Sequence, residues 1–230
     1  MRNRLIIEAL GTFFLCLAMF AGNNIHALAA LYGALLYLSA PVGIAHYNPA
    51  VSLACHLRGR IGFKGLLACV GVQLAAGLVA VVVAALLFGY DPERAEQVLQ
   101  ALDQPTYQGM WAMAVIELLG TFMLALIFLV VGTSRLTAGN GYFGMVLALA
   151  FLGLSIAPFD PSLNPVAALV LLLKGVPSAL FEGLFGTKAF ATEVVLIAQV
   201  APRVAVDVAA QLSGAALAAG LFRVLFPDDR

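Results

Sequence analysis

The sequence reads Ala-His-Tyr-Asn-Pro-Ala-Val-Ser over residues 45–52 and Asn-Pro-Val-Ala over residues 164–167. Asparagine is a preferred N-cap and proline is favoured at the first position of a helix, so each Asn-Pro pair predicts a helix start. The apolar segments that begin there, 48–57 and 164–173, are ten residues long. As helices they reach only about 15 Å, half of a bilayer. Two such short segments in matching places are typical of re-entrant half-helices at a transport site.

Six longer apolar runs surround these segments. They cover residues 5–22, 25–45, 65–89, 110–132, 141–158 and 204–226, each near the length that crosses about 30 Å of hydrocarbon. Of the 230 residues, 63% are hydrophobic and 10% are charged, against about 25% charged in an average soluble domain. The sequence therefore predicts an all-α, multi-pass integral membrane protein. The formal net charge is zero, which offers no basic surface for a nucleic acid.

The two halves of the chain repeat each other. Glu-Ala-Leu-Gly-Thr-Phe at 8–13 returns as Glu-Leu-Leu-Gly-Thr-Phe at 117–122, and Gln73 in the third run corresponds to Gln211 in the sixth. Each half holds three spans, an odd number, so the halves insert with opposite topology. We therefore expect one domain over 1–230, made of inverted repeats of about 1–89 and 110–230 joined by an external loop, 90–109.

Lysine and arginine predict the orientation. A cytoplasmic N-terminus assigns eight basic residues to the inside and four to the outside, as the positive-inside rule requires. The inner set is Arg2, Arg4, Arg58, Arg60, Lys64, Arg135, Arg223 and Arg230, and the outer set is Arg94, Lys174, Lys188 and Arg203. Both termini are then cytoplasmic. Short termini and short loops suit a bacterial inner membrane.

On these motifs the chain resembles the aquaporins, also called the major intrinsic protein family. The resemblance covers nearly the whole chain. It rests on the paired Glu-x-x-Gly-Thr-Phe helices, the Asn-Pro-Ala-Val block at 48–51 and Gly-Ala-Ala-Leu-Ala-Ala at 214–219. It implies an aquaporin-like fold with six transmembrane helices and two re-entrant half-helices. It also implies a homotetramer in the lipid bilayer, with one pore per subunit.

The two Asn-Pro blocks predict the middle of this pore. Half-helices entering from opposite faces would bring two positive dipole ends and two asparagine amides to one point, where a passing water accepts hydrogen bonds. Each side-chain oxygen can cap its own helix, which leaves the amide N–H groups free to donate. The predicted midplane residues are Asn48, Pro49, Ala50, Asn164, Pro165 and Val166. Val166 departs from the family, which usually has alanine there.

Glu8 and Glu117 lie inside apolar runs, where carboxylates mark either function or a satisfied network. The resemblance implies that each braces a re-entrant loop by accepting backbone N–H bonds, with His46 in the same network. A proton-carrying role is the alternative. We also expect a set of glycines to allow close helix crossings: Gly11, Gly33, Gly77, Gly120, Gly153 and Gly214.

The resemblance also places an outer selectivity filter at Leu28, Leu152, Pro161 and Ala167. Most relatives carry arginine at the position of Ala167. None of these four residues is aromatic, charged or a side-chain hydrogen-bond donor, so the implied filter is wide and apolar. That argues against a strict water channel. Glycerol, urea and ammonia-like molecules are all compatible with it.

The second half is longer than the first. Gln73 follows Asn48 by 25 residues, whereas Gln211 follows Asn164 by 47. The extra residues fall within 174–203. They form either an external hairpin or lid, or a longer sixth helix broken at Pro202. Arg203 and Asp207 are four residues apart, so we expect them to pair on one helix face.

The predicted function is a passive transmembrane channel for small uncharged solutes, water included. A coupled inverted-repeat transporter and a non-conducting structural membrane protein of the same fold stay as alternatives. We do not expect an enzyme, because no nucleophile–base pair can be assembled. No metal or cofactor is expected either, since the cysteines and histidines lack ligand spacing.

Overall fold

The computed structural model describes residues 2–21, 24–88, 107–156, 161–172 and 189–229. The described part of the chain is helical. Its helices are α1 (Arg2–Ala21), α2 (Ile25–Ser39), α3 (Pro49–Leu57), α4 (Phe63–Phe88), α6 (Tyr107–Thr133), α7 (Phe143–Ser155), α8 (Pro165–Leu172) and α10 (Ala189–Leu225). Two short 3₁₀ helices, Ala40–Val42 and Arg135–Thr137, follow α2 and α6.

Five described helical stretches are long and apolar enough to cross a membrane: Arg2–Ala21, Ile25–Val42, Phe63–Ala84, Gly109–Thr133 and Ala201–Leu225. The run predicted at 141–158 forms α7, which has 13 residues and reaches only about 20 Å. A helix usually ends before the residue that precedes a proline, and Pro158 follows shortly after α7. Residues 157–160 and most of the predicted loop 90–109 lie outside the described residues.

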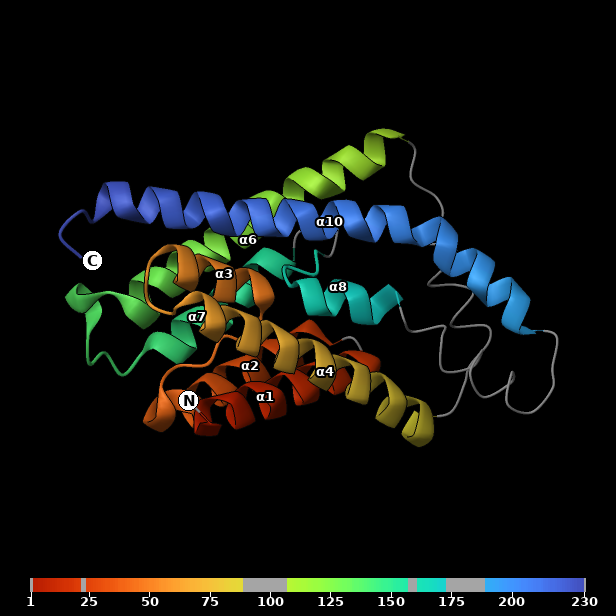
Figure 1. Cartoon of the computed structure of the whole chain (residues 1–230), viewed down its shortest axis with the longest axis horizontal. Helices are drawn as coiled ribbons and strands as arrows, with labels where there is room; N and C mark the ends of the chain where they lie inside the picture. The colour runs from red at the N-terminus through yellow and green to blue at the C-terminus, as the bar shows by residue number, and fades with distance from the viewer. Residues whose placement is uncertain (1, 22–23, 89–106, 157–160, 173–188, 230) are drawn as a thin grey trace.

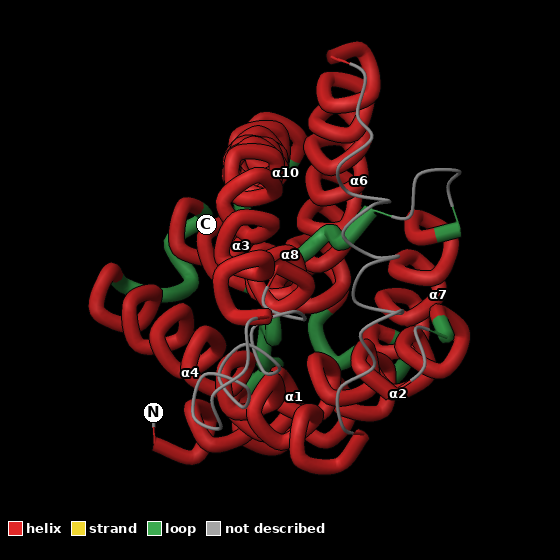
Figure 2. Tube along the Cα trace, turned by 90° about the vertical axis from the view of Figure 1, so that its right-hand side faces the viewer, coloured by secondary structure: helices red, strands yellow, loops and turns green. Residues whose placement is uncertain are grey.

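The two half-helices form the centre of the molecule. Viewed end-on, α3 and α8 lie in the middle, with α1, α2, α4, α6, α7 and α10 around them (Figure 2). From the centre, α3 and α8 extend in opposite directions (Figure 1). The first and third long helices of each half pack together, α1 with α4 and α6 with α10, and α2 packs against α7 across the repeat. This is the six-helix, two-half-helix inverted repeat that the sequence predicts.

Both chain ends lie at the same end of the molecule, on the left in Figure 1. An even number of crossings produces this arrangement, because each crossing carries the chain to the other side. We call this end the termini side.

The sixth long helix contains part of the extra residues that make the second half longer than the first. The helix α10 runs from Ala189 to Leu225, 37 residues with Pro202 inside it, and it changes direction along its length in Figure 1. It begins well before the predicted run at 204–226, so the longer helix is the alternative that the structure favours; residues 173–188 lie outside the described part. The predicted pair is confirmed: Arg203 Nε lies 4.0 Å from Asp207 Oδ2.

A buried carboxylate holds three elements together on the termini side. Asp229 lies 2.9 Å from Arg58 Nη2 and 3.5 Å from Arg60 Nη2, and it accepts the backbone N–H of Arg135 at 3.2 Å. The Arg58 guanidinium also stacks over the Phe222 ring of α10, 4.3 Å from its centroid. The end of α3, the turn after α6 and the end of α10 are thereby tied to one point.

Replacing Asp229 by asparagine is expected to lower the melting temperature in detergent by several degrees at pH 7. The reason is that Arg58, whose side chain is 1% exposed, would keep a buried charge without a partner, which costs on the order of 3 kcal/mol. Thermal unfolding followed by intrinsic fluorescence measures this. Asp228→Asn, at an exposed neighbouring position, is the control and should melt like the wild type.

The same prediction has a pH dependence. Burial alone would raise the pKa of Asp229, but hydrogen bonds from Ser134 and Arg135 and the charge of Arg58 hold that pKa below its ordinary value of 3.8. A lowered pKa in the folded state means that the stabilisation is present above pH 3.8 and is lost as the pH falls through the folded pKa. The gap between wild type and Asp229→Asn should therefore close in strong acid. A gap that stays constant through this range would contradict the role of the carboxylate charge.

Candidate functional site

Each Asn-Pro pair begins its half-helix with a side-chain cap. Asn48 Oδ1 accepts the backbone N–H groups of Ala50 at 2.8 Å and Val51 at 3.4 Å. Asn164 Oδ1 accepts the N–H of Val166 at 3.0 Å. Asparagine at the N-cap and proline at the first helical position are what the local sequence favours. The structured half-helices start one residue after each predicted asparagine, which is where a cap stands.

The amide nitrogens of the two asparagines cross between the halves. Asn48 Nδ2 donates to the carbonyl of Leu163 at 2.8 Å, and Asn164 Nδ2 donates to the carbonyl of Tyr47 at 2.9 Å. Each asparagine therefore bonds the residue that precedes its counterpart. The prediction that both N–H groups of each amide stay free is wrong for one of the two, because the loop carbonyls need donors at membrane depth. The second N–H of each amide has no partner among the described residues.

The residue before each asparagine has an unusual backbone. Tyr47 has φ 55° and Leu163 has φ 52°, both in the left-handed region, which costs a residue with a side chain about 1–3 kcal/mol. A methyl group at Gly11 would clash with the Tyr47 ring, and one at Gly120 would clash with Leu163. These two glycines, predicted to allow helix crossings, instead make room for the loop residues. The Glu-x-x-Gly spacing of the repeat is explained in this way.

Glu8 receives three donors from the first re-entrant loop and α4. The backbone N–H groups of His46 and Tyr47 donate to its two oxygens, both at 2.8 Å, and Gln73 Nε2 donates at 2.9 Å. The side chain of Glu8 is fully buried. A carboxylate bonded to backbone donors on both oxygens fixes the position of the loop that leads to Asn48.

Glu117 repeats this arrangement in the second half. The N–H and hydroxyl groups of Ser162 donate to Oε1 at 2.7 and 2.8 Å, and Leu163 N–H and Gln211 Nε2 donate to Oε2, both at 3.0 Å. The geometry is that of a brace. Neither carboxylate is exposed to the solvent, since Glu8 is 0% and Glu117 is 2% exposed. A proton carrier would need solvent access.

His46 connects the first brace to the N-terminal helix. Its Nδ1 lies 2.9 Å from Ser52 Oγ and its Nε2 lies 2.6 Å from Arg4 Nη2. Cys69 of α4 completes a buried group with Glu8 and His46, whose ligand atoms lie within 4.8 Å of one another. Such a set could hold a metal in principle, but the carboxylate and both ring nitrogens already make hydrogen bonds to protein groups. The cluster is therefore part of the loop support.

The predicted filter residues lie on three elements and a loop. Leu28 is buried on α2, Leu152 is half-buried on α7, and α2 packs against α7. Pro161 is buried immediately before Ser162, and Ala167 is buried on the first turn of α8. Pro161 therefore adjoins the loop that Glu117 holds through Ser162. The structure describes no contact that joins all four side chains.

The valine in the second block has a matching glycine. Val166 is buried against α4, where a methyl group at Gly77 would lie 2.7 Å from Val166 Cγ1. In the repeat, Ala50 of α3 corresponds to Val166, and Ala215 of α10 corresponds to Gly77. Both alanines are fully buried in the main core. A larger side chain on the half-helix is thus accommodated by a smaller one on the facing helix. Val166 is compatible with an intact second half-helix.

The remaining glycines that were predicted to allow close helix crossings differ in what lies against them. Gly214 lies against the backbone of Leu118, so the expected close crossing of α10 and α6 is confirmed, and Gly33 lies against the backbone of Gly144 on α7. A methyl group added at Gly153 would have no heavy atom of the described residues within 4 Å. Within the described residues of one subunit, no helix crosses at Gly153.

Sequence reasoning did not assign roles to four side chains of the site: Gln73, Gln211, Ser52 and Ser162. Gln73 Nε2 also donates to Ser52 Oγ at 3.2 Å, and Gln211 Nε2 to Ser162 Oγ at 2.7 Å. The repeat already pairs Gln73 with Gln211 in the sequence. A polar residue that recurs in both halves inside apolar helices was the signal that could have found them.

Known proteins resemble this chain in sequence and in fold. The sequence matches the family model described as "Major intrinsic protein" over residues 23–171, which is more than half of the chain. No curated protein sequence matches it. Among solved structures, it is similar to an aquaglyceroporin from Plasmodium falciparum, with 19% identity and a TM-score of 0.62, over 97% of this chain and 96% of that one. At this identity the structural match reports the fold. The family match spans both Asn-Pro blocks and both bracing loops, and the chain belongs to the major intrinsic protein family.

Proposed function

We propose that the protein is a passive channel through which small uncharged solutes, water included, cross the bilayer past Asn48 and Asn164. The crossed asparagines carry this proposal. Each has one N–H bonded to the opposite loop and a second N–H without a partner in the described structure. Two rigid donors at the junction of two half-helix N-termini suit a path for molecules that accept hydrogen bonds and carry no positive charge. Pro49, Ala50, Pro165 and Val166 hold the two helix starts that aim these donors.

The solute class follows from the proposed filter at Leu28, Leu152, Pro161 and Ala167. These side chains offer no hydrogen bond and no charge, so a polar solute passes them without side-chain compensation. We expect molecules larger than water to be admitted and water flux to be modest. The relative from Plasmodium falciparum is called an aquaglyceroporin, which supports glycerol as one probe among glycerol, urea and ammonia.

The setting proposed for the channel is a homotetramer in a bilayer, with both termini in the cytoplasm. Large apolar side chains are exposed along α4 and α6, as lipid or a neighbouring subunit would require. They include Leu78, Val79, Val82, Trp111, Val115 and Leu119. The arginines on the termini side support the cytoplasmic orientation through the positive-inside rule.

The test is solute flux in proteoliposomes that contain the purified protein, measured by stopped-flow light scattering for water, glycerol and urea. Flux that follows each solute's own gradient supports the channel. Accumulation driven by an ion gradient would make the protein a coupled transporter, and no flux at all would make it a structural protein.

Ala167→Arg sharpens this test. The substitution adds five N–H donors and a positive charge where the proposed filter has none. Glycerol and urea permeability should fall about tenfold, while water permeability falls much less, because the longer side chain narrows the opening. Ala138→Arg, at an exposed position in the turn between α6 and α7, is the control. Unchanged solute permeability in Ala167→Arg would remove position 167 from the filter.

A further inference from the structure

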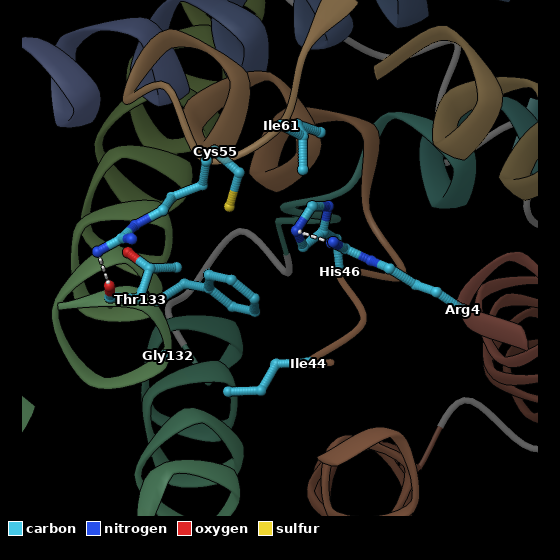
Figure 3. Close-up of a pocket in the computed structure, with 9 residues that line it drawn as sticks. Arg4, Ile44, His46, Cys55, Ile61, Gly132 and Thr133 are labelled. Carbon is cyan, nitrogen blue, oxygen red and sulfur yellow. Dashed lines mark hydrogen bonds between the residues drawn. The ribbon is translucent and has the colours of Figure 1, made fainter. Parts of the chain in front are cut away.

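A cavity of about 250 Å³ lies on the termini side (Figure 3). Its lining brings together Arg4 of α1, His46 of the first re-entrant loop, Cys55 of α3, Arg60 of the following turn, and Phe128 and Thr133 of α6. Two guanidinium groups and an imidazole therefore face one space, and no carboxylate is among its lining residues. His46 stands two residues before Asn48, so the cavity adjoins the approach to the crossed asparagines.

The two guanidinium groups differ in how their charge is compensated. Arg60 Nη2 donates to the carbonyl of Thr133 at 2.6 Å and lies 3.5 Å from Asp229. Arg4 makes no ion pair within the described residues, and its Nε is buried without a hydrogen-bond partner there. Glu8, one turn further along α1, directs its oxygens to the loop and to Gln73. Arg4 therefore supplies a positive charge to the cavity that no salt bridge within the described residues offsets.

The Arg4 side chain has a defined position. It reaches from α1 to the His46 ring, as Figure 3 shows, with 2.6 Å between Nη2 and Nε2. A guanidinium has only donors, so Nε2 must accept. Nδ1 then carries the ring proton and donates to Ser52 Oγ at 2.9 Å. The His46 ring is 5.5 Å from the Phe128 ring, edge to face, which fixes its plane. Arg4 is held in the cavity by a neutral, oriented imidazole.

We infer that Arg4 is a specificity-determining residue of the channel, and that its guanidinium is the fixed charge that excludes cations from the path. The inference rests on the proposed function. Ala167 stands on α8 and the cavity lies beside α3, and these half-helices extend in opposite directions from the centre (Figure 1). The charge that the proposed filter lacks is therefore supplied on the other side of the asparagine pair. In a confined space of about 250 Å³ such a charge acts strongly on ions.

The experiment compares Arg4→Gln, Arg4→Lys and the wild type in proteoliposomes. Arg4→Gln keeps a hydrogen-bond donor and removes the charge, whereas Arg4→Lys keeps the charge. Arg2→Gln, at an exposed position on the same helix, is the matched control. Potassium leak is followed with a potassium-sensitive dye and urea flux by stopped-flow light scattering, on the same vesicles. We expect Arg4→Gln to leak potassium about tenfold faster than the wild type with urea flux within about twofold, and Arg4→Lys and Arg2→Gln to stay near the wild type.

Each other outcome overturns the inference. If Arg4→Gln excludes potassium as well as the wild type while urea still passes, the charge filter lies elsewhere and the proposed function stands. If Arg4→Lys leaks as much as Arg4→Gln, the charge is not the property that matters. If Arg4→Gln loses urea flux, Arg4 belongs to the scaffold. If the wild type passes no neutral solute, the proposed function fails and the inference fails with it.

Discussion

Asn48→Asp is expected to reduce glycerol and urea permeability to a tenth of the wild-type value or less. Aspartate keeps the oxygen that caps Ala50 and Val51 but cannot donate to the Leu163 carbonyl, which Asn48 Nδ2 reaches at 2.8 Å. A carboxylate facing a carbonyl at membrane depth leaves two acceptors without a donor. The carboxylate also removes the second N–H that the proposed path offers to a solute, and losing a hydrogen bond worth about 1.4 kcal/mol at the crossing point slows flux about tenfold.

Asn164→Asp should have the same effect, because Asn164 Nδ2 donates to Tyr47 in the mirror position. The matched control is Asn24→Asp. Asn24 caps α2 through its side-chain oxygen in the same way, but it is exposed and its amide makes no crossing bond in the described structure. Aspartate is an equally good N-cap, so this variant should conduct normally. Circular dichroism and gel filtration verify the fold, and normal flux in both crossing variants would exclude the asparagines from the conduction path.

The largest loss of stability is expected from Glu117→Ala. The substitution leaves the N–H groups of Ser162 and Leu163 and the amide of Gln211 without their acceptor. At about 1–3 kcal/mol for each unsatisfied buried donor, the loss is on the order of several kcal/mol. In the first half, Glu8→Ala leaves three hydrogen-bond donors without their acceptor. It should destabilise the protein to a similar extent.

Thermal unfolding in detergent measures these losses, with Asp228→Ala at an exposed position as the control. Glu117→Gln keeps one acceptor oxygen and should fall between the alanine variant and the wild type. If both alanine variants melt like the wild type, the glutamates do not brace the loops. A pH-dependent flux that disappears in either variant would instead favour the proton-carrying alternative.

The half-helices could be predicted from sequence because their boundaries are set locally. The segments predicted at 48–57 and 164–173 form α3 over Pro49–Leu57 and α8 over Pro165–Leu172. An asparagine cap and a proline act on the next two or three residues, so no knowledge of the rest of the chain is needed. Five of the six apolar runs contain helices long enough to span for a similar reason, since lipid demands a continuous apolar length, while the run at 141–158 forms the shorter α7.

Features that depend on distant partners could not be predicted. Pro202 permits either a break or a bend, and the choice in α10 depends on what packs around it. The contact between Arg4 and His46 joins residues 42 apart in the sequence, and no pattern near either one indicates it. The glycines of the repeat were recognised as sites of close approach, but the sequence cannot say whether a helix or a loop side chain fills the space, as Tyr47 does beside Gly11.

The crossed bonds between the two re-entrant loops also impose an order on biosynthesis. The amide of Asn48 needs a carbonyl 115 residues further along the chain, and the carbonyl of Tyr47 needs an amide 117 residues further along. When the first three spans leave the translocon, these groups have no partner at membrane depth, where each unpaired group is costly. The first loop is held by Glu8 within its own half, but it completes its hydrogen bonds only after the second half has been inserted. A nascent chain that stops after α4 leaves the Asn48 amide and the Tyr47 carbonyl without these partners at membrane depth.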